Sequence, residues 1–181
     1  MKARTVWIIL FRGVGGATRL PVAPLRRKLA EAGFQKVATY INSGNAIVGS
    51  DLAREAVVER IAGICAREFG FEKDIHAVSL AEWEALIEAN PFPDAVAVPK
   101  FLLAAVLAGD PEPEKVSSLR ASAAPGEGFA VIDKVTYIHT PGGFDGRNLA
   151  ARFDKGIGVP NTARNWNTVL KLAELARAAA T

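Results

Sequence analysis

Apolar and polar positions switch between strand spacing and helix spacing along the first half of the chain. Residues 5–11 are apolar on both alternating faces apart from Thr5, which predicts a strand in the middle of a covered sheet. Apolar side chains then recur at helical spacing in two segments, and three further segments have the composition of strands. The apolar stripes of the expected helices span 22–32 and 53–65, and Gly70 is expected to end the second helix. The expected strands are 36–42, 46–49 and 74–78. Their order, β-α-β-β-α-β, is typical of the split βαβ, or ferredoxin-like, fold.

Local signals at the ends of these segments agree with this division. Gly33 stands where a helix C-cap is expected, and Gly44 supplies the positive φ that a tight hairpin turn needs. Asp51 is the expected N-cap of the second helix. Ser79 with Glu82 three residues later forms a capping box, which predicts a further short helix through residue 89.

Prolines interrupt the pattern near the middle of the chain. Three of them fall within residues 91–99, where they exclude a helix or a central strand and mark the expected boundary. The order β-α-β-β then returns, with helices after it. We therefore predict an α+β fold of two ferredoxin-like halves, residues 1–90 and 91–181, packed closely as two small domains or one. The second half is expected to be degenerate and to end in a helix from about residue 164 to 179.

Composition and charge narrow the class of protein. The chain has 181 residues, is 50% hydrophobic and carries a net charge of +3, which fits a globular protein without a basic nucleic-acid-binding tail. The single cysteine, Cys65, cannot form an internal disulfide and lies on an apolar helix stripe. It is expected to be a small core residue in a reducing cytoplasm. The apolar run at 5–11 is too short to cross a membrane, so no membrane partner is expected.

A glycine-rich loop, RGVGG, follows the first predicted strand and precedes a helix. Glycines allow backbone amides to approach an anion, and a helix N-terminus adds a favourable dipole. Arg12 would be the charged partner of Gly13, Gly15 and Gly16. The alternative is a tight strand-to-helix connection without a ligand.

The stretch TYINSGN forms the predicted hairpin turn. Asn42 at the strand end, next to Ser43, would offer donors and acceptors to a ligand, and Gly44 and Asn45 complete the turn. Ordinary hairpin chemistry explains the same residues equally simply, because Asn, Ser and Gly all favour turns.

The stretch TARNWNT precedes the last apolar helix. Thr162 is the expected N-cap, with Asn165 as the alternative if the helix begins later, and Trp166 would start its buried stripe. Capping and packing do not explain Arg164, which is unfavourable near a helix N-terminus, or its grouping with Asn165 and Asn167. We therefore take these three as candidate ligand-binding residues.

Motifs for catalysis and metal binding are absent from the sequence. His76 and His139 lie on separate predicted strands without metal-ligand spacing, so we expect no metal and no cofactor. Asp145 and Asp154 flank a polar segment after the last predicted strand and are candidates for a carboxylate pair.

Four of these stretches occur together in a known family. The strand–RGVGG–helix opening, TYINSGN, the NPFP segment and TARNWNTVLKL resemble an uncharacterised bacterial family, domain of unknown function 1697. In that family the loop usually reads RGINVGG. Here it is two residues shorter, and a shorter loop cannot make the same cradle. The resemblance implies an α+β fold of two ferredoxin-like halves and implies no activity.

Three functions are compatible with these observations. The first is binding of a small anionic or nucleotide-like ligand in a cleft between the halves, with the three polar stretches converging on it. The second is nucleic-acid binding, for which Trp7 and Phe11 would be the exposed aromatic residues on the first strand. The third is an enzyme that uses Arg164 and Asn165, or the region from Asp145 to Asp154. Oligomeric state and ligand identity are not predicted.

Overall fold

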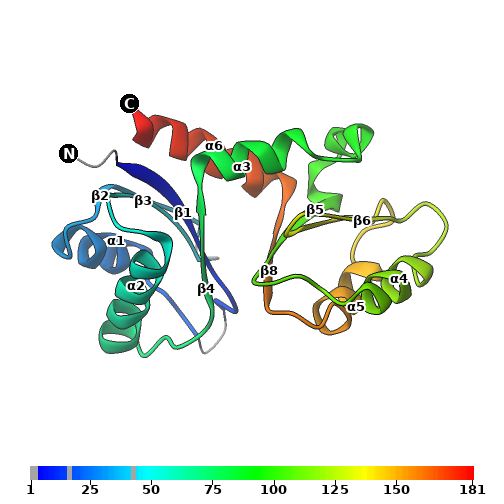
Figure 1. Cartoon of the computed structure of the whole chain (residues 1–181), viewed down its shortest axis with the longest axis horizontal. Coiled ribbons are helices and arrows are strands. Elements are labelled where there is room, and N and C mark those ends of the chain that lie inside the picture. The colour runs from blue at the N-terminus through cyan, green and yellow to red at the C-terminus, as the bar shows by residue number, and fades with distance from the viewer. Residues whose placement is uncertain (1–3, 16–17, 42–43) are drawn as a thin grey trace. The chain divides into compact units, whose positions relative to one another are not determined.

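The computed structural model describes residues 4–15, 18–41 and 44–181, and within them it has two four-stranded antiparallel sheets and six α-helices (Figure 1). This is the predicted α+β class. The chain divides into two units, Met1–Ala85 with Lys171–Thr181, and Leu86–Leu170. The boundaries of the units fall inside α3 (Leu80–Glu88) and α6 (Trp166–Ala180). None of the described helices is both long enough and apolar enough to cross a membrane.

The first unit has a sheet with strand order β2-β3-β1-β4, in which every neighbouring pair is antiparallel. Helices α1 and α2 pack on one face of this sheet (Figure 1). The elements before α3 are β1 (Thr5–Phe11), α1 (Val22–Glu31), β2 (Gln35–Tyr40), β3 (Asn45–Ser50), α2 (Arg54–Phe69) and β4 (Ile75–Ser79).

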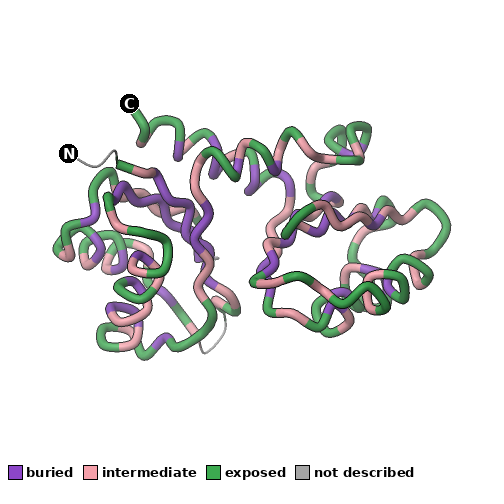
Figure 2. Tube along the Cα trace, in the orientation of Figure 1, coloured by how far each residue is buried: buried purple, intermediate pink, exposed green. Residues whose placement is uncertain are grey.

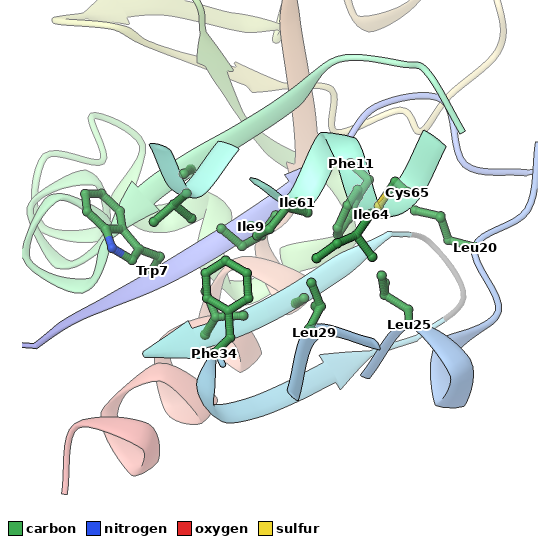
Figure 3. Packing of buried hydrophobic residues seen from close by; sticks show 14 of the residues in the cluster. Trp7, Ile9, Phe11, Leu20, Leu25, Leu29, Phe34, Ile61, Ile64 and Cys65 are labelled. Carbon is green, nitrogen blue, oxygen red and sulfur yellow. The ribbon is translucent and has the colours of Figure 1, made fainter. Parts of the chain in front are cut away.

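Strand β1 is buried along almost its whole length, as its sequence predicts (Figure 2). Its side chains Trp7, Ile9 and Phe11 point toward α1 and α2, where they meet Leu29 and Ile61 among other apolar residues (Figure 3). Burying a large apolar side chain contributes about 1.5–3 kcal/mol, so this layer supplies much of the stability of the first unit. The opposite face of β1 is buried as well, because Ile8 and Leu10 are 0% exposed.

The ends of these elements show which of the predicted capping and turn residues have the expected role. Gly44 has φ +76° in the hairpin turn and Gly33 has φ +90° directly after α1, as expected. The capping box is confirmed, because Ser79 N donates to Glu82 Oε2 at 2.9 Å and Glu82 N donates to Ser79 Oγ at 3.3 Å. The prediction for Asp51 is wrong. Helix α2 begins after Ala53, whose side chain cannot accept a hydrogen bond.

The second unit has a sheet with order β6-β7-β5-β8, again antiparallel throughout. Helices α4 and α5 pack on its face through Leu119, Leu149 and Phe153, which contact Phe129 and Ile138 of the sheet. The elements after α3 are the 3₁₀ turns η1 (Pro93–Ala97) and η2 (Pro99–Phe101), then β5 (Leu102–Leu107), α4 (Pro113–Ala121), β6 (Gly128–Ile132), β7 (Val135–His139), α5 (Leu149–Gly156), β8 (Asn161–Asn165) and α6.

The second half is more complete than its sequence predicts. The polar segment after β7 and the stretch expected to begin the last helix contain two further elements, α5 and β8. β8 lies at the edge of the sheet beside β5, which explains why five mostly polar residues can form a strand there. The prediction of a degenerate half without a fourth strand is therefore wrong.

Cys65 is a core residue, as expected, and burial raises the pKa of its thiol to about 12. We predict that the folded protein does not react with a thiol reagent at pH 8, and that unfolding in urea releases one reactive thiol. Since the pKa is raised in the folded state, this thiol contributes stability that is fully present below about pH 8.5 and is lost as the pH rises toward 12. Rapid labelling of the native protein at pH 8 would contradict this burial.

Candidate functional site

Three chain segments meet at the end of β1. The Phe11 backbone N–H donates to the Gly44 carbonyl, and the Arg12 N–H donates to the Asp74 carbonyl, each at 2.9 Å. The first bond joins the glycine loop to the β2–β3 hairpin, and the second joins it to the residue before β4. We call this region, made by residues 11–15, 44–45 and 73–74, the loop–hairpin end of the sheet. It brings together two of the three polar stretches that the sequence singles out.

The glycine loop turns sharply after Arg12. Gly13 has φ +68° and Gly15 has φ +150°, both in the region that favours glycine. Gly15 and Thr18 exchange backbone hydrogen bonds at 2.7 and 3.0 Å, so the amide of Gly15 closes the turn instead of pointing to a ligand. Of the loop's candidates, Arg12 and Gly13 remain candidate ligand-binding residues. Gly16 lies outside the described residues.

The hairpin turn is packed tightly against the loop. A Cβ on Gly44 would lie 2.6 Å from Val14 Cγ2 and 2.9 Å from Phe11 Cβ, so only glycine fits there. Asn45 is buried, and its side-chain amide donates to the Tyr40 carbonyl at 3.3 Å. Its amide thus helps to hold the hairpin. Asn42 and Ser43 lie outside the described residues.

Two cationic side chains flank the loop–hairpin end. Arg12 is half-buried and Lys73 is exposed, with Lys73 Cγ 4.0 Å from where a Cβ on Gly13 would stand. The sequence pattern does not single out Lys73. Lys73 stands two residues before β4, which pairs antiparallel with β1 and therefore starts where β1 ends. This pairing is the signal that could have predicted that Lys73 lies near the glycine loop. The neighbouring carboxylates of Glu72 and Asp74 are exposed.

The third polar stretch belongs to the second unit. Arg164 is on β8, where Nη1 donates to Thr162 Oγ1 at 2.7 Å and to the Ala163 carbonyl at 2.8 Å. Burial lowers the pKa of this guanidinium to about 10. Thr162 is a strand residue, so its expected capping role is wrong. The alternative holds, since Asn165 Oδ1 accepts from Thr168 N at 3.0 Å at the start of α6.

Asn167 and the two carboxylate candidates each have their own local surroundings in the second unit. Asn167 is exposed in the first turn of α6. Asp145 Oδ1 accepts the backbone N–H groups of Arg147 and Asn148, each at 2.8 Å, and the Arg147 bond is the main cause of the lowered pKa of Asp145. Asp154 accepts from the side chain of Asn161 at 3.2 Å. Both carboxylates therefore have structural partners.

The two histidines lie on strands of different sheets. His139 packs against the ring of Phe92, with centroids 6.3 Å apart. His76 is on β4, opposite Leu10 of β1. Within the described part of the chain, no three His, Cys, Asp or Glu side chains are grouped so that they could hold a metal ion.

The aromatic residues expected to serve nucleic-acid stacking are inside the core. Trp7 is 7% exposed and Phe11 is 1% exposed, because α1 and α2 cover this face of the sheet. A base needs an exposed aromatic face to stack on. These two residues therefore cannot act as stacking platforms, which corrects the role predicted for them.

The fold and the loop–hairpin end define a two-sheet α+β protein with a cationic glycine loop. The chain belongs to the family described as protein of unknown function (DUF1697), whose model matches residues 4–137. Its fold is similar to that of the conserved bacterial protein SP0830 from Streptococcus pneumoniae, with a TM-score of 0.72 and 24% identity. That similarity covers 96% of this chain and 99% of the other. The comparison with curated proteins gave no match.

Proposed function

We propose that the protein binds a small anionic ligand, such as a phosphate-bearing molecule, at the loop–hairpin end of the first sheet. The observation that carries this proposal is the pair of backbone hydrogen bonds from Phe11 and Arg12, which gathers three segments around two cationic side chains. A rigid scaffold that presents loops at strand ends is a common way to build a binding site.

The chemistry of the two cations suits a phosphate group. A guanidinium donates through a planar fork that matches two phosphate oxygens, and an ammonium adds a mobile point charge. Arg12 is half-buried, so fewer rotamers are lost when it binds than for an exposed arginine. Gly13 at φ +68° has no side chain to keep an anion away from the backbone.

The strand orders support a finer description of the scaffold. In each unit the chain order β-α-β-β-α-β is combined with an antiparallel sheet whose fourth strand lies beside the first and whose third strand separates the first from the second. We propose that each unit is ferredoxin-like on this ground. A reducing, cytoplasmic location is proposed from the single cysteine, which is buried.

Titration calorimetry with inorganic pyrophosphate tests the ligand proposal. Arg12→Gln and Lys73→Gln each remove a charge-assisted contact, so each is expected to weaken the affinity by about tenfold. Arg26→Gln is the matched control, because Arg26 is an exposed arginine on α1. Its expected effect is less than about twofold.

A third variant is expected to tighten binding, where Arg12→Gln and Lys73→Gln weaken it. Asp74→Asn removes a negative charge next to Lys73 and keeps the backbone carbonyl that accepts from Arg12, so it is expected to tighten pyrophosphate binding. Equal affinities for the wild type, Arg12→Gln and Lys73→Gln would refute a role for the loop–hairpin end.

A further inference from the structure

A second polar site lies at the opposite end of β1, within the first unit. The start of β1, the start of β2, the N-terminus of α2 and the C-terminal end of α6 border an open pocket of about 690 Å³. This volume is in the range of cavities that hold small organic ligands. The side chains that matter here are Arg4, Trp7, Lys36, Arg54, Leu80 and Glu84.

The charges around this pocket do not cancel. Arg54 Nη2 is 2.6 Å from Glu82 Oε1, and Arg177 Nε is 2.8 Å from Glu84 Oε1, so each of these pairs is neutral. Arg4 and Lys36 have no carboxylate partner among the described residues. The pocket therefore has two cationic side chains, Arg4 and Lys36, that no described carboxylate pairs with at ion-pair distance.

The backbone places both cations at the pocket. Gly49 on β3 leaves room for the stem of Arg4, because a Cβ there would lie 2.9 Å from Arg4 Cδ. Lys36 has φ +52° at an irregularity in the pairing of β2 with β3, between Gln35 and Ala38. A bulge of this kind redirects a side chain, and a positive φ at a lysine costs free energy that other contacts must offset.

Trp7, which lines the same pocket, has an unsatisfied hydrogen-bond donor. The indole Nε1–H of Trp7 is buried and has no hydrogen-bond acceptor among the described residues. Arg54 covers the face of this ring, with Cζ 5.4 Å from its centroid, and so keeps the indole in place. A buried donor without an acceptor costs free energy, which a ligand oxygen would recover.

From these features we infer that the pocket of Arg4, Trp7 and Lys36 binds an organic phosphate monoester. A phosphate monoester carries close to two negative charges at neutral pH, which suits the two cationic side chains of Arg4 and Lys36. Its oxygens accept from donors in several directions, as a guanidinium, an ammonium and an indole would supply. Val6, Leu80 and Ala81 give the pocket an apolar wall for the organic part. This site does not depend on the loop–hairpin end.

Phenyl phosphate is the probe that tests this inference on the full chain. In a ¹⁵N–¹H spectrum, assigned through contacts between each indole and its own backbone, only the Trp7 indole peak among the three tryptophans is expected to shift. Arg4→Gln and Lys36→Gln, both at exposed positions, are each expected to weaken the affinity that this peak reports by about tenfold. Arg26→Gln, at an exposed position on α1, is expected to change it by less than about twofold.

Two further ligands test separately whether the organic group and the negative charge contribute to binding. Inorganic phosphate is expected to bind more weakly than phenyl phosphate, and neutral benzyl alcohol is expected not to move the indole peak. A stationary Trp7 peak at saturating phenyl phosphate would overturn the site, as would unchanged affinity in both Arg4→Gln and Lys36→Gln. Equal binding of inorganic phosphate would overturn the organic part, and equal binding of benzyl alcohol would overturn the anionic part.

Discussion

Replacing Trp166 by alanine is expected to lower the free energy of unfolding by about 3–5 kcal/mol. The indole is the first side chain of α6 and is only 2% exposed, so its loss removes a large buried apolar surface and leaves a cavity. Urea unfolding followed by circular dichroism measures the change.

Asn167→Ala is the matched control for Trp166→Ala. It alters the next residue of the same helical turn, but the side chain of Asn167 is exposed. Its effect is expected to stay within about 0.5 kcal/mol. Similar losses in the two variants would mean that the start of α6 is sensitive to any substitution and that Trp166 is not a packing anchor.

Gly44→Ala is expected to destabilise the protein by about 2–5 kcal/mol. Two costs add together at this position. A residue with a Cβ is strained at φ +76°, and the new methyl group would lie 2.6 Å from Val14 Cγ2 and 2.9 Å from Phe11 Cβ. The substitution thus pushes the hairpin and the glycine loop apart.

Gly70→Ala separates these two costs. Gly70 follows α2 with φ +63°, and a Cβ there would meet nothing within 4 Å. It is expected to lose only the conformational part, about 1–2 kcal/mol. The difference between the two alanine variants measures the contact between hairpin and loop. If Gly44→Ala cost no more than Gly70→Ala, the two segments would not be packed as described.

The first sheet could be predicted from the sequence because its signals are local. Residues 5–11 are apolar on both faces and predict a buried strand. Gly44 predicts the hairpin turn, and Ser79 with Glu82 predicts the start of the next helix. The structure has a strand, a turn and a helix start at these places. Only the N-cap of α2 was misplaced, since Asp51 stands two residues before Ala53, after which the helix begins.

The end of the second unit was harder to predict because its signals conflict. The apolar residues Leu149, Phe153 and Ile157 recur at intervals of four, which is the signal for α5, but the polar residues around them hide it. In β8 the residues Asn161 and Asn165 have poor strand propensity, and Asn161 and Thr162 are also good helix caps. Their pairing with β5 decides the outcome, and a pairing partner distant in the sequence leaves no local trace.

The candidate site could be predicted only in part for the same reason. The glycine loop and the hairpin turn are separate motifs in the sequence, and antiparallel pairing of β1 with β3 brings them together. Lys73 carries no motif and enters the site only through the pairing of β1 with β4. The sequence indicated Arg164 because a cation is unfavourable near a helix N-terminus. In the structure Arg164 is a strand residue that donates a hydrogen bond to Thr162.

The central claim is that the loop–hairpin end of the first sheet binds an anion, and a ¹⁵N–¹H titration with inorganic pyrophosphate tests it most directly. The backbone peaks of Gly13 and Gly44, which belong to different segments of this end, are expected to shift together with one dissociation constant. In Arg12→Gln the same two peaks are expected to need about tenfold more pyrophosphate. Glycine peaks that stay in place at saturating pyrophosphate would contradict the claim.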